Sequence, residues 1–362
     1  MSFVSPSLAS PSLRRAALAV ALFAAAFACA CHKQESGREI AYVAVPQSFI
    51  RDRVAPVYKK VATVHNSDRL EVLERKRRFA LVRTANGEQG WIQERYLVSE
   101  MVYEVAHKLP ETARALPIQA RAVTRAAVNL HIFPGRDTPH LFQLQQDEPV
   151  EIYQRTTHAK DQPAQQPAAQ KEKDKEKDDD TRDEVPEPLP LPMEDWLLVR
   201  SPKGLAGWIL ARMVFVDIPL EIAQYAEGER IVAYFVLNEV MDSEQEKKVP
   251  QYLVLLSESK DGLPYDFDQA RVFSWNLKRH RYETAYRERN LNGAFPARVA
   301  VETFEKEGSL PVFFLPVKDE QGKVSERKYK LNGPIVHRVL APGEAPAATR
   351  TSSSARGRSR RR

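Results

Sequence analysis

The residue types that most often carry enzyme chemistry are few and scattered in this chain. Both cysteines lie near the N-terminal end, at Cys29 and Cys31, so no thiol nucleophile is available beyond them. None of the eight histidines forms the HxH or HxxxH spacing that places two imidazoles on one zinc ion: His32, His65, His107, His131, His140, His158, His280 and His337. We therefore expect no metal site, no cofactor and no thiol or zinc hydrolase.

Other common catalytic motifs are also missing or incomplete. The chain has no GxSxG elbow and no glycine-rich phosphate loop. A carboxylate pair for glycan hydrolysis stays open, because such pairs meet only in three dimensions. Asp266 and Asp268 could begin a calcium loop, but Lys260 and Gly262 leave too few ligand positions, so a solvated turn is predicted there. The sequence favours binding over catalysis.

The clearest regularity is a repeat. FALVR at 79–83 is followed by GWI at 90–92, and WLLVR at 196–200 is followed by GWI at 207–209. In each copy the interval from arginine to tryptophan is eight residues and contains a glycine turn. This spacing predicts two copies of one β-hairpin module.

Each hairpin belongs to a longer set of short β-runs. Residues 41–98 alternate apolar and polar positions, as in LEVL at 70–73, and predict a small antiparallel barrel. FIRD at 49–52 and GWIQERYL at 90–97 resemble the bacterial SH3-like domain, and VNLHIFPG at 128–135 is similar to the Leu-Asn-Val-Arg-x-x-Pro-Gly motif of that family. The resemblance implies a second barrel at 122–216.

The same resemblance implies a ligand groove. In the family, a shallow groove contacts cell-wall peptide or glycan through aromatic faces and charged rims. The matching positions are Arg51, Tyr58, Phe79, Trp91, Arg95 and Tyr96 in the first copy, and Trp196, Trp208 and Arg212 in the second. Met213 replaces the tyrosine in the second copy, which puts its groove in doubt. In the alternative interpretation, Trp91 and Trp208, each following a glycine at a strand start, fill the barrel cores.

The segments between these parts are predicted from composition. Residues 158–193, rich in Gln, Pro, Lys, Asp and Glu, predict a disordered acidic insertion in the second barrel. A short linking helix is predicted in 99–121, with Ser99 as N-cap, and another in 217–229, where Pro219 fits a first turn.

Residues 230–340 form a separate β-rich domain in this interpretation. About seven runs of branched and aromatic residues predict an antiparallel sandwich or barrel, and no family is recognised for it. Its aromatic residues Trp275, Tyr282, Tyr286 and Phe295 are interpreted as core or cross-strand pairs. The whole chain is thus predicted to be all-β, with two small SH3-like barrels followed by this domain.

The two ends of the chain predict its location. Arg14 and Arg15 precede an apolar run at 16–28, so residues 1–31 resemble a lipoprotein signal with Cys29 or Cys31 as the lipidated residue. An ordinary cleaved signal is the alternative. The net charge of +6 equals the six arginines of the tail, 341–362, which predicts a disordered basic segment for anionic lipid or lipopolysaccharide.

These features together predict a non-catalytic protein of the cell envelope. The chain is expected to be exported to the periplasm or the outer cell surface, to be held at a membrane by a lipid, and to bind peptidoglycan or an envelope protein. Nucleic acid is not expected as a partner. Two alternatives remain: a glycan-acting enzyme that uses the barrels for targeting, and a scaffold whose barrels bind a protein partner.

Overall fold

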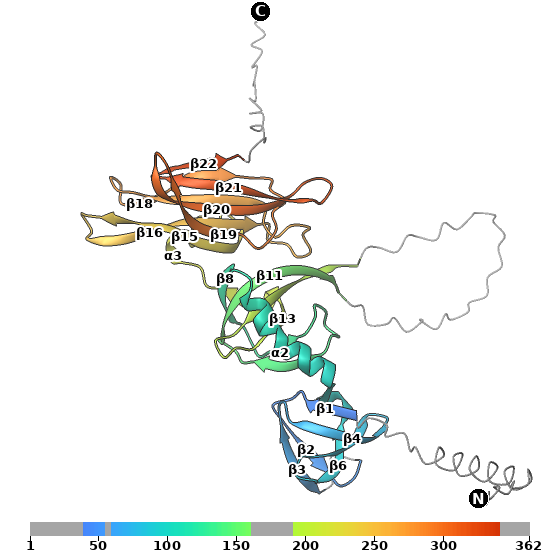
Figure 1. Cartoon of the computed structure of the whole chain (residues 1–362). Helices are drawn as coiled ribbons and strands as arrows, with labels where there is room; N and C mark the ends of the chain where they lie inside the picture. The colour runs from blue at the N-terminus through green and yellow to red at the C-terminus, as the bar shows by residue number, and fades with distance from the viewer. Residues whose placement is uncertain (1–38, 55–58, 161–190, 341–362) are drawn as a thin grey trace, which may run out of the picture.

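The computed structural model describes residues 39–54, 59–160 and 191–340. The predicted signal with Cys29 and Cys31, the groove candidate Tyr58, most of the acidic insertion and the basic tail lie outside the described residues. The chain is all-β, built from antiparallel sheets with few helices. Its three parts follow one another in space as they do in sequence (Figure 1).

The first module is a seven-stranded antiparallel sheet. Its strands are β1 (Glu39–Val43), β2 (Gln47–Arg51), β3 (Lys60–His65), β4 (Arg69–Lys76), β5 (Phe79–Arg83), β6 (Gln89–Gln93) and β7 (Leu97–Ser99), in the order β3-β2-β6-β5-β4-β1-β7. Alternate side chains from strands at both ends of this order, including Val64 and Val43, meet in one core around Ile50 and Ile92. The sheet therefore curls around its own buried face.

The second module repeats this topology. Its strands are β8 (Ala120–Thr124), β9 (Val128–His131), β10 (His140–Leu144), β11 (Pro149–Ala159), β12 (Met193–Arg200), β13 (Ala206–Leu210) and β14 (Val214–Val216), in the equivalent order β10-β9-β13-β12-β11-β8-β14. The sequence repeat is thus a structural repeat. His158 and Met193, predicted to lie inside the insertion, belong to strands, because β11 and β12 pair as far as Ala159 and Met193.

A steric constraint explains why a glycine precedes each of the two repeated tryptophans. At Gly90 a Cβ atom would lie 2.5 Å from the backbone oxygen of Arg51, where β6 crosses β2. At Gly207 it would lie 2.7 Å from the Cβ of Leu130 on β9. At the glycine of each Gly-Trp pair two strands therefore lie so close together that no side chain fits.

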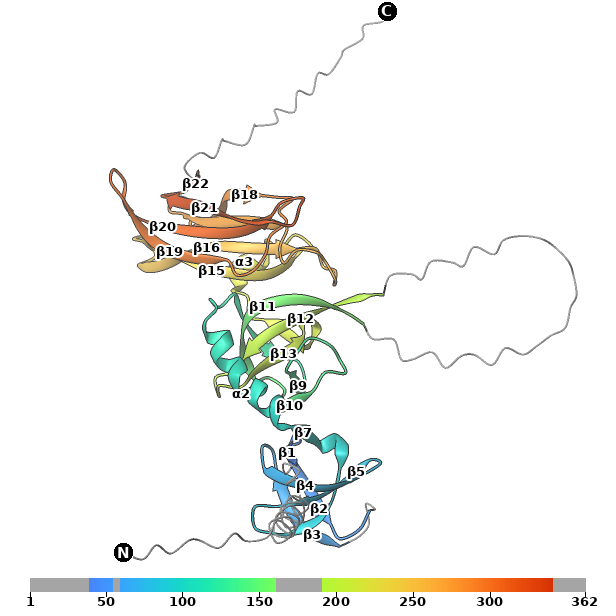
Figure 2. The ribbon, with the colours of Figure 1, turned by 45° about the vertical axis from the view of Figure 1, so that its right-hand side comes forward.

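Helix α2 (Glu100–Arg114) joins the two modules and packs on both of them (Figure 2). The hydroxyl oxygen of Ser99 accepts a hydrogen bond from the Val102 amide (3.4 Å), as expected of an N-cap. Tyr103 stacks on Tyr42 of the first module at 3.8 Å between ring centroids. Ala113, further along the helix, is buried against the second module.

The second linking segment contains little helix. Within 217–229 only α3 (Leu220–Ala223) forms, a single turn after Pro219. Ile222 of this turn is buried against the outer face of the next sheet, so the turn is fixed by packing. No helix among the residues described here combines the length and the apolar character needed to cross a membrane.

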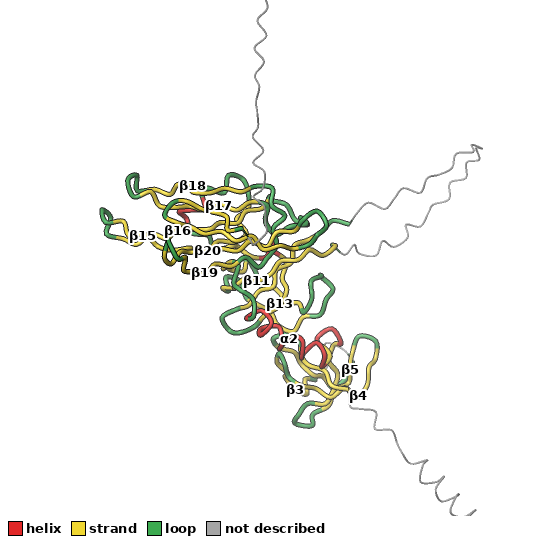
Figure 3. Tube along the Cα trace, turned by 45° about the horizontal axis from the view of Figure 1, so that its top comes forward, coloured by secondary structure: helices red, strands yellow, loops and turns green. Residues whose placement is uncertain are grey.

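The C-terminal domain is a sandwich of two four-stranded meanders (Figure 3). One sheet holds β15 (Arg230–Asp242), β16 (Lys247–Ser257), β17 (Gln269–Asn276) and β18 (Arg281–Glu288); the other holds β19 (Arg298–Phe304), β20 (Gly308–Lys318), β21 (Val324–Asn332) and β22 (Ile335–Val339). A cluster that includes Leu255, Phe267 and Phe313 fills the space between them. Of the two predicted shapes, the sandwich is the one observed.

The aromatic residues singled out in this domain make ring contacts. Trp275 meets Tyr282 edge to face at 5.0 Å, Tyr286 lies 5.8 Å from Tyr329, and Phe295 lies 6.0 Å from Phe267. The interpretation as core and cross-strand pairs is confirmed for these rings.

The close approach at Gly90 makes a first prediction. The Gly90→Ala variant is expected to lose about 1–3 kcal/mol of unfolding free energy, because its methyl group must push β2 and β6 apart. Urea unfolding of the purified chain measures this. The control is Gly87→Asn, at a left-handed φ of 86° where a Cβ meets no atom within 4 Å and asparagine is tolerated. Equal stability of the two variants would contradict the steric explanation.

Candidate functional site

A shallow groove of about 360 Å³ lies on the outer face of the first module. Strand β2 contributes Phe49 and Arg51, β5 contributes Phe79 and β6 contributes Trp91. Tyr96 closes one end from the 3-10 turn η1 (Glu94–Tyr96). Three strands and one turn thus place four aromatic rings around a single concavity.

Strand alternation explains why Trp91 faces outward. On β6 the inward positions are Gly90 and Ile92, and Ile92 is 1 % exposed in the core. In the second module Ile209 takes the same core position, next to Trp208. The alternative in which the two tryptophans fill the barrel cores is therefore wrong, because the isoleucines that follow them do so.

The groove is cationic as well as aromatic. The Arg51 guanidinium lies 5.8 Å from the Phe49 ring centroid, and the Lys60 ammonium lies 4.7 Å from it. Arg95 lies 5.0 Å from the Tyr96 ring and donates a hydrogen bond to its hydroxyl oxygen (3.0 Å). None of the described residues that line the groove carries a carboxylate. Such a surface suits a ligand with flat apolar faces and negative charge.

Most of the predicted first-copy residues meet here. Arg51, Phe79, Trp91 and Tyr96 line the groove, and Arg95 reaches it through Tyr96. Phe49 and Arg53 line it too and were missed by the sequence analysis. The signal for Phe49 was available, because a residue two positions before Arg51 on a strand shares its face.

The second-copy predictions are wrong for Trp196. Its side chain is 1 % exposed, and the ring of His131 contacts it edge to face at 5.3 Å between centroids. A side chain enclosed in this way cannot contact a ligand. Phe79, its equivalent in the first module, is only partly buried and lines the groove.

Trp208 and Arg212 are also engaged within the protein. Trp208 packs in a cluster with Ala113 of α2 and Leu198 of β12, so the helix covers the face that is open in the first module. Arg212 donates a hydrogen bond to Glu194 at 2.8 Å. The hydrogen bond from Arg136 and, after it, that from Arg212 lower the pKa of Glu194 to about 2. In the described part of the second module, these contacts occupy the face on which the resemblance implied a second groove.

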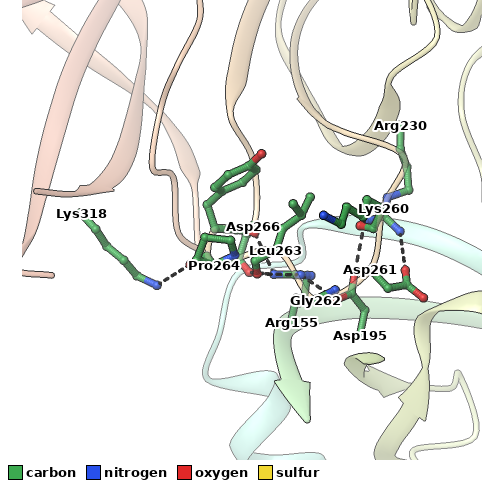
Figure 4. Close-up of polar contacts among 11 residues, drawn as sticks. Arg155, Asp195, Arg230, Lys260, Asp261, Gly262, Leu263, Pro264, Asp266 and Lys318 are labelled. Carbon is green, nitrogen blue, oxygen red and sulfur yellow. Dashed lines mark hydrogen bonds and ion pairs between the residues drawn. The ribbon is translucent and has the colours of Figure 1, made fainter. Parts of the chain in front are cut away.

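A second notable site is the buried charge cluster between the second module and the C-terminal domain (Figure 4). Arg155 of β11 has a side chain only 6 % exposed. Its guanidinium donates to Asp195 Oδ1 (2.7 Å), Asp266 Oδ1 (3.0 Å), and the backbone oxygens of Leu263 (3.1 Å) and Tyr265 (2.8 Å). The arginine is thus bound by both domains at once.

Asp195 completes the cluster from β12. It is 2 % exposed, and besides Arg155 it accepts hydrogen bonds from Arg230 (3.2 Å) and from the Gly262 amide (2.9 Å). The solvated turn predicted at Asp266 is wrong, because the folding of the two domains against each other buries that carboxylate. Burial raises the pKa of Asp266, although Phe295 and Arg155 donate hydrogen bonds to it.

A third contact fixes the same joint. The side chain of Gln119, just before β8, is buried; its Nε2 donates to the Ala297 oxygen (3.0 Å), and its Oε1 accepts from the Ala297 amide (2.9 Å). One amide side chain thereby satisfies both backbone groups of one residue in the partner domain. No sequence pattern indicates this pairing, since the residues are 178 positions apart.

The far end of the sandwich holds one further polar cluster. Asp242, at the end of β15, accepts hydrogen bonds from His280 Nδ1 (2.7 Å) and Trp275 Nε1 (2.9 Å). His280 Nε2 lies 2.7 Å from Glu244. The hydrogen bond to Asp242 is the main cause that raises the pKa of His280. Burial raises the pKa of Asp242, but hydrogen bonds, first that of His280, lower it to about 2.

The geometry defines a class of protein: tandem β-modules of one topology, one with an open aromatic groove, attached to a β-sandwich. No family model and no curated protein matches the sequence. Among solved structures the chain is similar to NlpC1 and NlpC2 from Trichomonas vaginalis. Each is 10 % identical over 81 % of this chain and 93 % or 97 % of the other, with TM-scores of 0.17 and 0.16. These scores are too low to assign a fold or a function.

The buried charge cluster makes a second prediction. Asp195→Ala is expected to cost about 3–5 kcal/mol of unfolding free energy, because Arg155 and Arg230 lose a carboxylate that no water replaces easily. Urea unfolding measures the loss. The matched control is Glu326→Ala, which breaks an exposed pair with Arg298 (2.8 Å) and should cost less than about 1 kcal/mol. A loss at Asp195 as small as the control's would contradict the importance of the cluster.

The His280 cluster makes a third prediction, on pH. Because the pKa of His280 is raised on folding, the histidine stabilises the folded state fully at pH values below 6.5, its pKa in the unfolded chain. This stabilisation is lost as the pH rises through the pKa of the folded state. Because the pKa of Asp242 is lowered on folding, this carboxylate stabilises the folded state at pH values above 3.8, its pKa in the unfolded chain. This stabilisation is lost as the pH falls towards 2. His280→Gln should therefore destabilise the chain more at pH 5.5 than at pH 9.

Urea midpoints of the wild-type chain and His280→Gln at the two pH values test this. His65→Gln, which removes an exposed histidine of the first module, is the control. The prediction fails when the stability difference caused by His280→Gln is the same at both pH values.

Proposed function

We propose that the chain is a non-catalytic binding protein of the cell envelope, and that the groove of the first module holds peptidoglycan. The ligand's sugar rings or apolar peptide side chains would stack on Trp91 and Phe79. The stem-peptide carboxylates would lie at Arg51, Arg53 and Arg95. Export and a lipid anchor at Cys29 or Cys31 belong to the same proposal, and they rest on the sequence of the first 31 residues.

One observation carries the proposal. The same outer face exists in both modules, but it is open, aromatic and cationic in the first and covered by α2 in the second. Aromatic rings left partly exposed in a groove cost free energy unless a ligand covers them. Because the lining side chains include no acid among the described residues, nothing within the groove itself repels a carboxylate-bearing ligand.

Recognition without chemistry fits the groove's composition. Glycan hydrolysis requires two carboxylates that face one ligand. The buried carboxylates Asp195 and Asp266 are instead bound to Arg155, and they lie at the domain joint. Its described lining residues supply aromatic surfaces, arginines and neutral polar side chains such as Gln47 and Gln93, which is what attachment to a polymer needs.

Co-sedimentation of the purified chain with protein-free peptidoglycan tests the proposal. Trp91→Ala is expected to weaken pelleting about tenfold, since truncating a central aromatic residue of a binding site typically costs more than about 1 kcal/mol. Higher salt should weaken it further, because the carboxylate contacts are screened.

Phe133→Ala is the matched control, because Phe133 is 55 % exposed on the second module, outside the groove. It should pellet like the wild-type chain. Circular dichroism and urea unfolding show that the variants remain folded. No pelleting of the wild-type chain at low salt, or equal pelleting of Trp91→Ala, would overturn the proposal.

A further inference from the structure

A cleft of about 530 Å³ lies between the second module and the C-terminal domain, beside the buried charge cluster. Its wall is mostly apolar, and Val214, Val216, Ile218, Ala226 and Ile231 are among the residues that line it. Three carboxylates line it as well, and each has a partner: Asp195 and Asp261 are paired with Arg230, and Glu229 accepts hydrogen bonds from Gln269. The volume is in the range of small-molecule sites, which occur preferentially at domain interfaces. The cleft is separate from the groove of the first module and plays no part in the proposed function.

Two hydrogen-bond donors at this cleft have no acceptor. The Nε atoms of Arg155 and Arg230 are buried and make no hydrogen bond within the described part of the chain, and both arginines line the cleft. The other guanidinium nitrogens of Arg155 are bonded to Asp195, Asp266 and backbone oxygens. These two atoms have almost no accessible surface, so the charge that a ligand meets in the cleft comes from its rim.

The rim of the cleft adds a positive charge. Arg125 stacks on Phe215 at 3.8 Å from the ring centroid, and its Nε donates to the Val214 oxygen (3.2 Å). Arg155, Arg212 and Arg230 have carboxylate partners, whereas none is found for Arg125 among the described residues. Phe215, 54 % exposed, offers further apolar surface beside it.

We propose that this cleft binds an amphiphile with one carboxylate and one alkyl chain. The carboxylate lies at the guanidinium of Arg125, which supplies both the neutralising charge and the hydrogen-bond donors. The alkyl chain lies along the wall formed by Val214, Val216 and Ile231. A peptide fits less well along Val214, Val216 and Ile231, because its backbone N–H and C=O groups would lose their water there against side chains that form no hydrogen bonds.

Isothermal titration of the full chain with palmitate, below its micelle concentration, tests this proposal, and hexadecanol is the uncharged comparison. Palmitate is expected to bind at one site per chain. Arg125→Gln should weaken the binding of palmitate about tenfold, because it removes the charge that pairs with the carboxylate. It should leave the weaker binding of hexadecanol unchanged.

Two further variants separate the cleft from other surfaces. Ala226→Phe places a ring in the cleft without removing an apolar contact and should abolish binding, while urea unfolding confirms that the variant is folded. Arg121→Gln, an exposed arginine of β8 outside the lining, should bind palmitate like the wild-type chain. Absence of palmitate binding, binding that survives Ala226→Phe, or equal effects of Arg125→Gln on both amphiphiles would overturn the proposal.

Discussion

The guanidinium of Arg155 sets the arrangement of the larger half of this molecule. A charge buried to this degree is tolerated only when carboxylates and carbonyls surround it. Here Asp195 comes from the neighbouring strand of the same module, whereas Asp266 and the backbone oxygens of Leu263 and Tyr265 come from the sandwich. Separating the two domains would remove three of the four acceptors of this buried guanidinium, so the second module and the sandwich are held as one unit. Gln119 reinforces the joint with two hydrogen bonds to one residue of the sandwich.

One topology serves two purposes in the chain. In both modules a seven-stranded sheet curls around an apolar core, and one tryptophan lies on its outer face. The residue before that tryptophan is a glycine, because the neighbouring strand leaves no room for a side chain there. In the second module α2 packs on that face, and Trp208 becomes part of an internal contact. In the first module the face is left open, and its rings line a groove. The difference follows from the helix, which packs on Trp208, and from strand residues, since His131 of β9 packs on Trp196.

Local patterns in the sequence were sufficient for the strands and for one face of the groove. The family resemblance indicated Trp91 and Phe79 as groove residues, with a core position left open for Trp91, and the repeat indicated two copies of one hairpin module. The pattern could not show that Trp196 would be enclosed or that α2 would cover Trp208, because both depend on packing between elements distant in sequence. The same holds for Asp266: its run of alternating acidic and aromatic residues is typical of an exposed turn, and only the approach of β11 buries it. Pairings such as Asp242 with His280, 38 positions apart, leave no periodic trace.

The packing of α2 on both modules has a mechanical meaning. Tyr103 is stacked on Tyr42 at one end of the helix, and Ala113 is buried under the second module at the other. The three parts follow one another along the length of the molecule (Figure 1). A pull on the groove would therefore pass in series through the tyrosine stack, the helix and the charge cluster at the next joint. The weakest of these joints sets the load that the whole chain can bear. The joint at the first module combines the tyrosine stack, apolar packing around Ala44 and Ala106, and a hydrogen bond from Asn66 to the Leu141 oxygen (2.6 Å). Because such packing is weaker than the buried ion pairs of the next joint, we expect the first joint to yield first.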